Sequence, residues 1–382
     1  YNNLGGLYNK QGRYAEAERL YKRSLAIREK IFGPEHPDVA LSLNNLGGLY
    51  DKQALYAEAE RLYKRSLAIR EKILGPDHTY VATSLDNLGL LYNKQGRYAE
   101  VELLYRRALV IMEKALGPEH PHVASILNNL ASLYDDQGLY ADAEPLYRRS
   151  MAIREKTLGS DHPDVAGSLF NLANLYKDQG RYVDADPLYQ KALAIYEIIH
   201  GPDHPFVAWS LNNLGILYYD RGLFPEAESV YKRSIAIYEK FVGIEHYYFA
   251  SAINNLAVLY SSQGQNEYLE SLYKRALAIF EKTFGAEHPE VRKILNNLGR
   301  FYDGQGQHKK GGILYERALK ISEKIFGLEN LNNASSILNL AYNLNKQGRL
   351  NEAEKLFKKS LAILEKGLGQ ENKSVVANLK GL

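Results

Sequence analysis

A histidine recurs in a short loop motif, which reads GPEHP at residues 33–37. Histidine can ligate a metal ion or transfer protons near neutral pH. The recurring residues are His36, His78, His120, His162, His204, His246 and His288. Packed helical units lie about 8–10 Å apart, whereas metal ligands lie about 2 Å from the ion. One histidine per unit therefore cannot share a metal, and we expect each to close its loop and cap the following helix. Asn330 and Asn372 fill the same place in the last copies.

The other residues suited to chemistry also lack a catalytic arrangement. A glutamate repeats as a single residue per copy, from Glu29, Glu71 and Glu113 on to Glu365, and we expect it to be structural. The chain has no cysteine, which excludes disulfides and thiol catalysis. No phosphate-binding loop, nucleophile elbow or zinc-protease motif is present. We predict that the chain is not an enzyme and has no metal site and no cofactor.

Composition and charge narrow the class of partner. Hydrophobic residues make up 45% of the 382 residues, charged residues 24%, and the net charge is +3. This near balance does not favour nucleic acid or an anionic membrane. No apolar run reaches about 18 residues, the length of a membrane-spanning helix. We expect a cytoplasmic protein that binds protein or peptide, and the sequence leaves its oligomeric state open.

An internal repeat organises the whole chain. Its anchors lie 42 residues apart at Gly33, Gly75, Gly117, Gly159, Gly201, Gly243, Gly285, Gly327 and Gly369. A period in this range is typical of stacked supersecondary units. Residues 42 positions apart are called a column below. Because Tyr1 and Leu382 both fall inside a copy, we interpret residues 1–382 as a single array within a longer protein.

Each copy contains two helical patterns. In residues 37–52, Val39, Leu43, Leu46 and Tyr50 form one apolar stripe. A second pattern follows in residues 56–74, and glycine residues separate the two. Such a hairpin cannot bury both faces alone, and stacked neighbours bury them together. We predict an all-α fold, a right-handed α-solenoid of helix–turn–helix hairpins.

The repeat resembles a known family. Leu43, Leu46, Gly47 and Tyr50 match L-x-x-L-G-x-x-Y, and Ala59 and Tyr63 match A-x-x-x-[FY], both typical of the tetratricopeptide repeat. The 42-residue form is similar to the repeat of kinesin light chains, although their amino-terminal heptad region has no counterpart here. The resemblance implies a concave groove lined by the first helix of each copy. Kinesin light chains take aromatic and acidic peptides there, which would place such a peptide at the lysine-rich end described below.

The second asparagine of the LNNL motif recurs in every copy. The column comprises Asn3, Asn45, Asn87, Asn129, Asn171, Asn213, Asn255, Asn297 and Asn339. Asparagine is a mediocre helix former, so its recurrence inside a helix requires a role. Two interpretations stay open: the amide bonds the backbone of a neighbouring unit and fixes the stacking, or it faces the groove and bonds the backbone of a peptide. One amide can do both.

Two further features lie on the same predicted helix face. A column seven residues after the asparagines changes sign in blocks, through Lys10, Lys52, Lys94, Asp136, Asp178 and Asp220. It is either a surface selected for a charged partner or plain solvated charge. Trp209, the only tryptophan, is either a ligand anchor or a contact between repeats.

One region departs from the pattern. Residues 265–270 read QNEYLE and residues 307–312 read QHKKGG, where other copies resemble RYAEAE. Leu269 replaces a small packing residue, which risks overpacking. Gly311 and Gly312 should each cost a helix about 1 kcal/mol. We predict that the array is least stable near residues 265–312.

Three functions remain possible at this point. The first is a non-catalytic scaffold that holds an extended peptide or a partner's surface in its groove. The second is the sensor or regulatory arm of a larger enzyme, an NTPase switch or a protease, with catalysis in flanking segments. The third is a passive spacer.

Overall fold

The computed structural model describes residues 1–265 and 267–368, apart from the side chains of residues 332 and 368. Within these residues the protein is helical and has no strand. The first helices of the copies are α1 Asn2–Lys10, α3 Pro37–Lys52, α5 Thr79–Lys94, α7 Pro121–Asp136, α9 Pro163–Asp178, α11 Pro205–Asp220, α13 Tyr247–Ser262, α15 Pro289–Gly304 and α17 Ala334–Lys346. The second helices are α2 Tyr14–Phe32, α4 Tyr56–Leu74, α6 Tyr98–Leu116, α8 Tyr140–Leu158, α10 Tyr182–His200, α12 Phe224–Phe241, α14 Leu269–Phe284, α16 His308–Phe326 and α18 Leu350–Leu368. The expected solenoid of hairpins is thus confirmed, while the anchor Gly369 lies outside the described residues.

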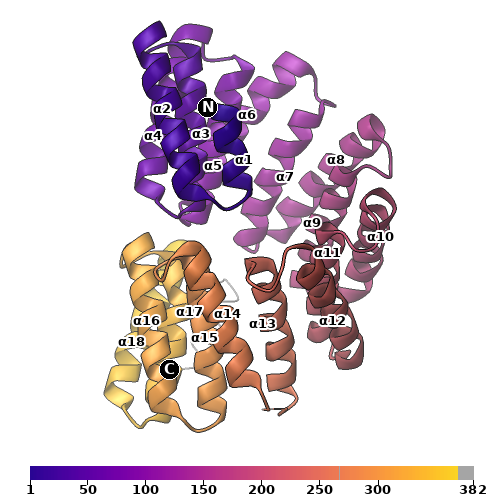
Figure 1. Cartoon of the computed structure of the whole chain (residues 1–382), viewed down its shortest axis with the longest axis vertical. Coiled ribbons are helices and arrows are strands. Elements are labelled where there is room, and N and C mark those ends of the chain that lie inside the picture. The colour runs from indigo at the N-terminus through magenta and orange to yellow at the C-terminus, as the bar shows by residue number, and fades with distance from the viewer. Residues whose placement is uncertain (266, 369–382) are drawn as a thin grey trace. The chain divides into compact units, whose positions relative to one another are not determined.

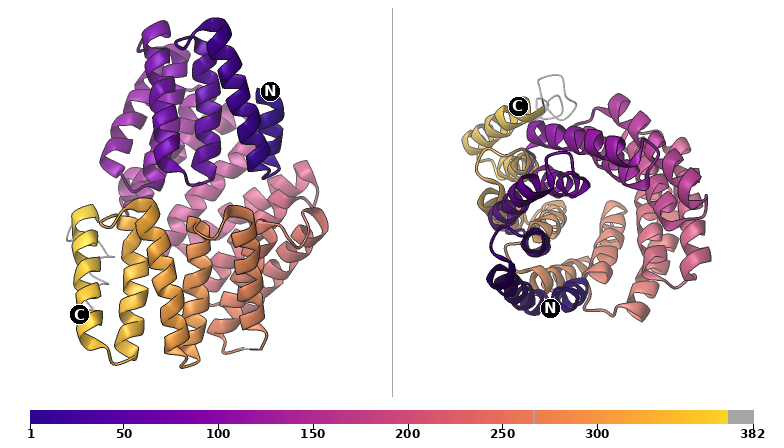
Figure 2. Two further views of the ribbon diagram at one scale, coloured as in Figure 1. Left: turned by 60° about the vertical axis from the view of Figure 1, so that its left-hand side comes forward. Right: turned by 90° about the horizontal axis from the view of Figure 1, so that it is seen from above.

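The chain forms two compact units, Tyr1–Ser160 and Asp161–Leu382. In each unit, a first helix packs against the second helix of its own copy, and that helix packs against the next first helix (Figure 1). In the second unit, α13, α14, α15 and α16 stand side by side in this order (Figure 2). Successive first helices, such as α3 with α5 or α13 with α15, also contact each other directly. The side chains of neighbouring first helices can therefore bond across copies.

The loop histidines begin the first helices, as expected. His36 Nδ1 accepts a hydrogen bond from the backbone N–H of Asp38 at 3.1 Å, and the same bond forms at each of the seven histidines. This bond satisfies one of the N–H groups that a helix start leaves free. The last described copy differs, because a 3₁₀ turn η1, Leu331–Asn333, precedes α17 and Asn333 rather than Asn330 is its N-cap residue.

Close packing of tyrosine explains the glycine of the repeat motif. A Cβ atom on Gly47 would lie 2.9 Å from the ring of Tyr63, which is 4% exposed. The absence of a side chain therefore lets the two helices of a copy approach each other. The Tyr50 hydroxyl donates to Glu18 of the preceding copy at 2.8 Å. Tyr50 and Tyr63 thus both belong to the buried core.

The glutamate column links second helices through ion pairs. Glu29 accepts from Arg65 of the next copy at 2.7 Å, and the pair recurs at Glu71, Glu113, Glu197 and Glu281. These side chains are about one third exposed, so each pair contributes little stability, about 0–1 kcal/mol. The column is structural, as predicted.

The irregular segment shortens one helix. The second helix α14 begins only at Leu269 and has 16 residues, whereas most of its equivalents have 19. Tyr268 precedes it in the left-handed region, with φ of 66°. Leu269 is fully buried beside Ala257 and Tyr273, so the later start of the helix accommodates the larger side chain that we expected to overpack.

Gly311 and Gly312 have a positive packing role that the sequence argument missed. A Cβ on Gly311 would lie 2.9 Å from Asp303 Oδ1, and one on Gly312 would lie 2.9 Å from Asn343 Oδ1. The buried Asn343 donates to Asp303 at 2.6 Å and to the backbone oxygen of His308 at 2.9 Å. The two glycines make room for this polar network, and α16 runs through them without a break.

Two features are absent from the part of the chain that the structure describes. None of its helices is long and apolar enough to cross a membrane. It also contains no group of three or more histidine or carboxylate side chains arranged to hold a metal ion.

Candidate functional site

Side chains of the asparagine column form hydrogen bonds between neighbouring first helices, and each such bond is called a rung below. Asn87 Nδ2 donates to Asn44 Oδ1 of the preceding copy at 2.9 Å. Equivalent rungs join Asn129 to Asp86 at 2.7 Å, Asn255 to Asn212 at 3.1 Å and Asn297 to Asn254 at 3.0 Å. The acceptor is a side chain of the neighbouring copy, whereas the stacking interpretation had named its backbone. A rung uses only one of the two N–H groups of the amide, so the other remains available at these positions.

The rungs stop at two places in the second unit. Asn213 faces Phe170 where other copies offer an asparagine, and it donates instead to the backbone oxygen of Trp209 at 2.9 Å. Farther along, no bond joins Asn339 to Asn296, and Asn296 Oδ1 is buried without a donor among the described residues. A buried acceptor without a partner is costly. Asn296 also lines the larger pocket described below.

The charged column is exposed in both units, and part of its charge is neutralised. Lys94 pairs with Asp51 of the preceding copy at 2.6 Å. Burial lowers the pKa of Lys52, and the nearby Lys94 and Lys10 lower it further, so Lys52 lies within electrostatic reach of both. In the first unit Asp136 also accepts a bond from Asn93 at 2.7 Å.

In the second unit, the acidic residues of the charged column also lie near opposite charges. Burial raises the pKa of Asp220, Lys177 lowers it and Asp178 raises it. Lys177 itself pairs with Asp178 at 2.6 Å. The change of sign along the column is thus matched in part by the chain's own opposite charges.

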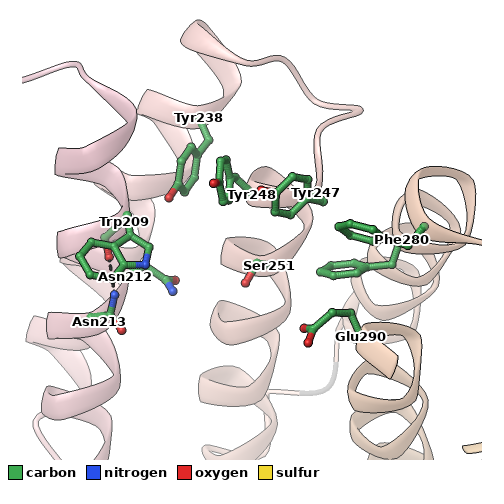
Figure 3. A pocket seen from close by; sticks show the side chains of 10 residues that line it. Trp209, Asn212, Asn213, Tyr238, Tyr247, Tyr248, Ser251, Phe280 and Glu290 are labelled. Carbon is green, nitrogen blue, oxygen red and sulfur yellow. Dashed lines mark hydrogen bonds between the residues drawn. The ribbon is translucent and has the colours of Figure 1, made fainter. Parts of the chain in front are cut away.

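Trp209 lies in a pocket on the first-helix face of the second unit. The pocket has a volume of about 240 Å³ and is called the aromatic pocket below. Its lining residues are Trp209, Asn212, Asn213, Tyr238, Tyr247, Tyr248, Ser251, Phe280, Phe284 and Glu290. Figure 3 shows Trp209 on one side, Glu290 on the other and Ser251 between them. Trp209 is 37% exposed, and its ring packs 4.4 Å from the buried Phe170, so it combines a core contact with a free surface.

The aromatic lining arises because one column of the second helices changes from arginine to aromatic residues. In the first unit, Arg70 is buried and donates to the Tyr80 backbone oxygen at 3.0 Å and to Ser84 at 2.7 Å. The same column holds Tyr238 and Phe280 in the second unit. Tyr238 stacks on Tyr248 at 5.5 Å, and burial raises its pKa, so the phenol stays neutral. Sequence reasoning missed these residues, although the change from arginine to aromatic at 42-residue spacing was visible.

A second, larger pocket adjoins the aromatic pocket. It has a volume of about 610 Å³ and is called the asparagine pocket below. Asn212, Ser251, Phe280 and Glu290 line both pockets. Its other lining residues are Ile216, Asn254, Asn255, Arg292, Lys293, Ile294, Asn296, Asn297, Arg300, Ser335 and Asn339. The two pockets thus form one groove across α11, α13, α15 and α17.

The groove contains some of the predicted site residues and not others. Trp209 and Asn213 line the aromatic pocket, and Asn255 and Asn297 line the asparagine pocket. Asp178 and Asp220 line neither. The column four residues before the asparagines, which contributes Trp209, Ser251, Lys293 and Ser335, forms its wall. The helix face on which spacing placed Trp209 and the asparagine column therefore lines a groove in the second unit.

Comparisons with known proteins agree with this architecture. A family model described as tetratricopeptide repeat matches residues 1–72, 52–114, 104–156, 122–198, 164–240, 248–311 and 293–366. A search of curated proteins finds no match.

Three solved structures show what the chain is similar to. One is a putative kinesin light chain of Podosopora anserina with nearly identical repeats, at 30% identity and a TM-score of 0.43, covering 54% of this chain and 98% of that one. Another is BtubC (BKLC) from P. vanneervenii, at 25% identity and a TM-score of 0.46, covering 62% and 92%. A third is a Rap protein complexed with Competence and Sporulation Factor, at 16% identity and a TM-score of 0.65, covering 97% and 98%. The matching segments of the family model together span most of the sequence, and the chain therefore belongs to the tetratricopeptide repeat family.

Proposed function

We propose that the protein is a non-catalytic interaction scaffold that holds an extended segment of a partner protein in the groove of its second unit. Tetratricopeptide repeats generally bind protein partners and are generally non-catalytic. The observation that carries the proposal is the continuity of the aromatic and asparagine pockets across four first helices. A groove that combines apolar anchors with convergent polar groups is typical of binding sites.

The polar groups of the groove suit a peptide backbone. Asn255 and Asn297 each keep one amide N–H beyond their rungs, and these can donate to backbone carbonyls. Main-chain bonds of this kind give affinity without selecting a sequence. Specificity would then come from the side-chain pockets.

We assign a secondary role to the predicted site residues that lie outside the groove. Asp178 and Asp220 of the second unit would select charges in the parts of a longer partner that extend past the groove, and the exposed lysines of the first unit would form a separate basic surface for acidic segments. Asn3, Asn45, Asn87, Asn129 and Asn171 would serve chiefly in stacking. The regulatory-arm hypothesis uses the same groove, whereas the spacer hypothesis gives it no ligand.

The test is a selection of random peptides on the full chain, repeated with a blocked groove. Ser251 lines both pockets, so Ser251→Arg should place a long side chain across the groove. Thr83→Arg is the matched control, because Thr83 is an exposed residue of the same column in the first unit. We expect peptides that bind the natural chain and the control but not Ser251→Arg. Peptides held equally by all three, or no peptide held by any, would contradict the proposal.

A further inference from the structure

We propose that the aromatic pocket receives a positively charged side chain of the partner, and that the asparagine pocket receives a carboxylate of the same segment. This inference rests on the proposed function and specifies its ligand. It predicts a partner segment in which an arginine or lysine lies near an aspartate or glutamate.

The charges of the aromatic pocket favour a cation. Its lining contains six aromatic rings and the carboxylate of Glu290, and no lysine or arginine belongs to it. The faces of aromatic rings attract cations, most strongly where water is excluded. A carboxylate on the opposite wall from Trp209 adds a formal negative charge (Figure 3). The aromatic rings and the Glu290 carboxylate therefore both favour a cation in the aromatic pocket.

The chain's own arginines show this type of contact with aromatic rings. The guanidinium of Arg70 lies 5.5 Å from the ring of Tyr80, and Tyr248 belongs to the same column as Tyr80. In the second unit, Arg275 lies 4.9 Å from the ring of Phe249. Because Tyr238 replaces the arginine beside Tyr248, no arginine of this column supplies a cation to the pocket. A cation would have to come from the partner.

The charge of the adjoining pocket is opposite. Arg292, Lys293 and Arg300 line the asparagine pocket, against the single carboxylate of Glu290. Glu290 pairs with Lys293 at 2.9 Å, and the two side chains are 40% and 62% exposed. Exposed pairs of this kind are weak. A partner cation can therefore take the place of Lys293, which is then available to a partner carboxylate.

A matched pair of probes tests the charge requirement. N-acetyl-L-arginine methylamide and N-acetyl-L-citrulline methylamide have nearly the same shape but differ by one positive charge. Since Trp209 is the only tryptophan of the chain, its fluorescence reports occupancy of the pocket. We expect the arginine probe to change Trp209 emission at concentrations about tenfold lower than the citrulline probe. Equal effects of the two probes, or no effect of either, would overturn the inference.

Variants separate this inference from the proposed function. Glu290→Gln should remove most of the preference for arginine over citrulline, while Asp38→Asn, in the same column of the first unit, should leave it unchanged. Peptides selected on the full chain should contain a basic and an acidic residue. If peptides bind the groove through an aromatic or aliphatic anchor with no cation, the charge inference is wrong and the proposed function stands. If no peptide binds, both are wrong.

Discussion

Asp86 is the one acidic residue in a rung column that otherwise offers mostly asparagine, and replacing it should stabilise the protein. Its carboxylate accepts a bond from Asn129 at 2.7 Å. Burial nevertheless raises its pKa, and the bond from Asn129 opposes this only in part. The loss of hydration on burial therefore outweighs the hydrogen bond, and the ionised carboxylate destabilises the folded state. Asp86→Asn would restore the rung found between Asn87 and Asn44.

The size of the stability gain from Asp86→Asn, and its pH dependence, follow from the balance between the burial of the charge and its hydrogen bond. A hydrogen bond to a charged group contributes about 1.5–3 kcal/mol and a neutral one about 0.5–1.5 kcal/mol. The substitution weakens the bond but removes the unfavourable burial of a charge, and substitutions toward a repeat consensus commonly gain about 0.5–2 kcal/mol. Because the pKa of Asp86 is higher in the folded state, its cost is present above that folded pKa and vanishes below the ordinary value of about 4. The gain from Asp86→Asn should therefore shrink as pH falls.

The assay is urea unfolding of the full chain, followed by circular dichroism at about pH 7 and about pH 4. Asp77→Asn supplies a control of opposite sign, because Lys114 lowers the pKa of Asp77. That variant should lose stability at neutral pH and lose less in acid. A lower stability of Asp86→Asn than of the natural chain at neutral pH, or a difference independent of pH, would refute the reasoning.

Three further predictions concern the backbone and the irregular segment. Ala54 has φ of 57° where the other copies have glycine, so Ala54→Gly should raise the free energy of unfolding in urea by about 0.5–1 kcal/mol, and a decrease would contradict this. Gly311→Ala should lose about 1–3 kcal/mol because its Cβ would meet Asp303, whereas Gly304→Ala, with open space around it, should lose none; equal losses in the same assay would be contrary evidence. Because α14 is shorter than its equivalents, hydrogen exchange should be fastest among helical amides within residues 265–312, and slowest exchange there would disprove a weak segment.

Much of the fold follows from the sequence because its signals repeat. The spacing of Gly33 and its equivalents fixed the period, and the predicted bounds of α3 and α4 agree with the structure. The structure differs from the prediction where a residue contacts a side chain of the neighbouring copy. Gly311 reads as a poor helix former until Asn343 of the next copy is placed beside it.

The candidate site was predictable only in part. Trp209 and the asparagine column were visible as unusual residues on one helix face. Their surroundings were not, because Tyr238 and Phe280 come from second helices that pack between the first helices. The charged column misled for a related reason: the partner of Lys94 is Asp51, 43 residues earlier. A pattern within one helix does not reveal which residue of the next helix faces it.

The central claim is that a partner segment lies in the groove beside Trp209. The most direct test titrates the full chain with a selected peptide that lacks tryptophan, and follows both peptide anisotropy and Trp209 emission. The account predicts that both signals change together and saturate at the same peptide concentration. A peptide that binds by anisotropy while Trp209 emission stays constant would place recognition elsewhere and contradict it.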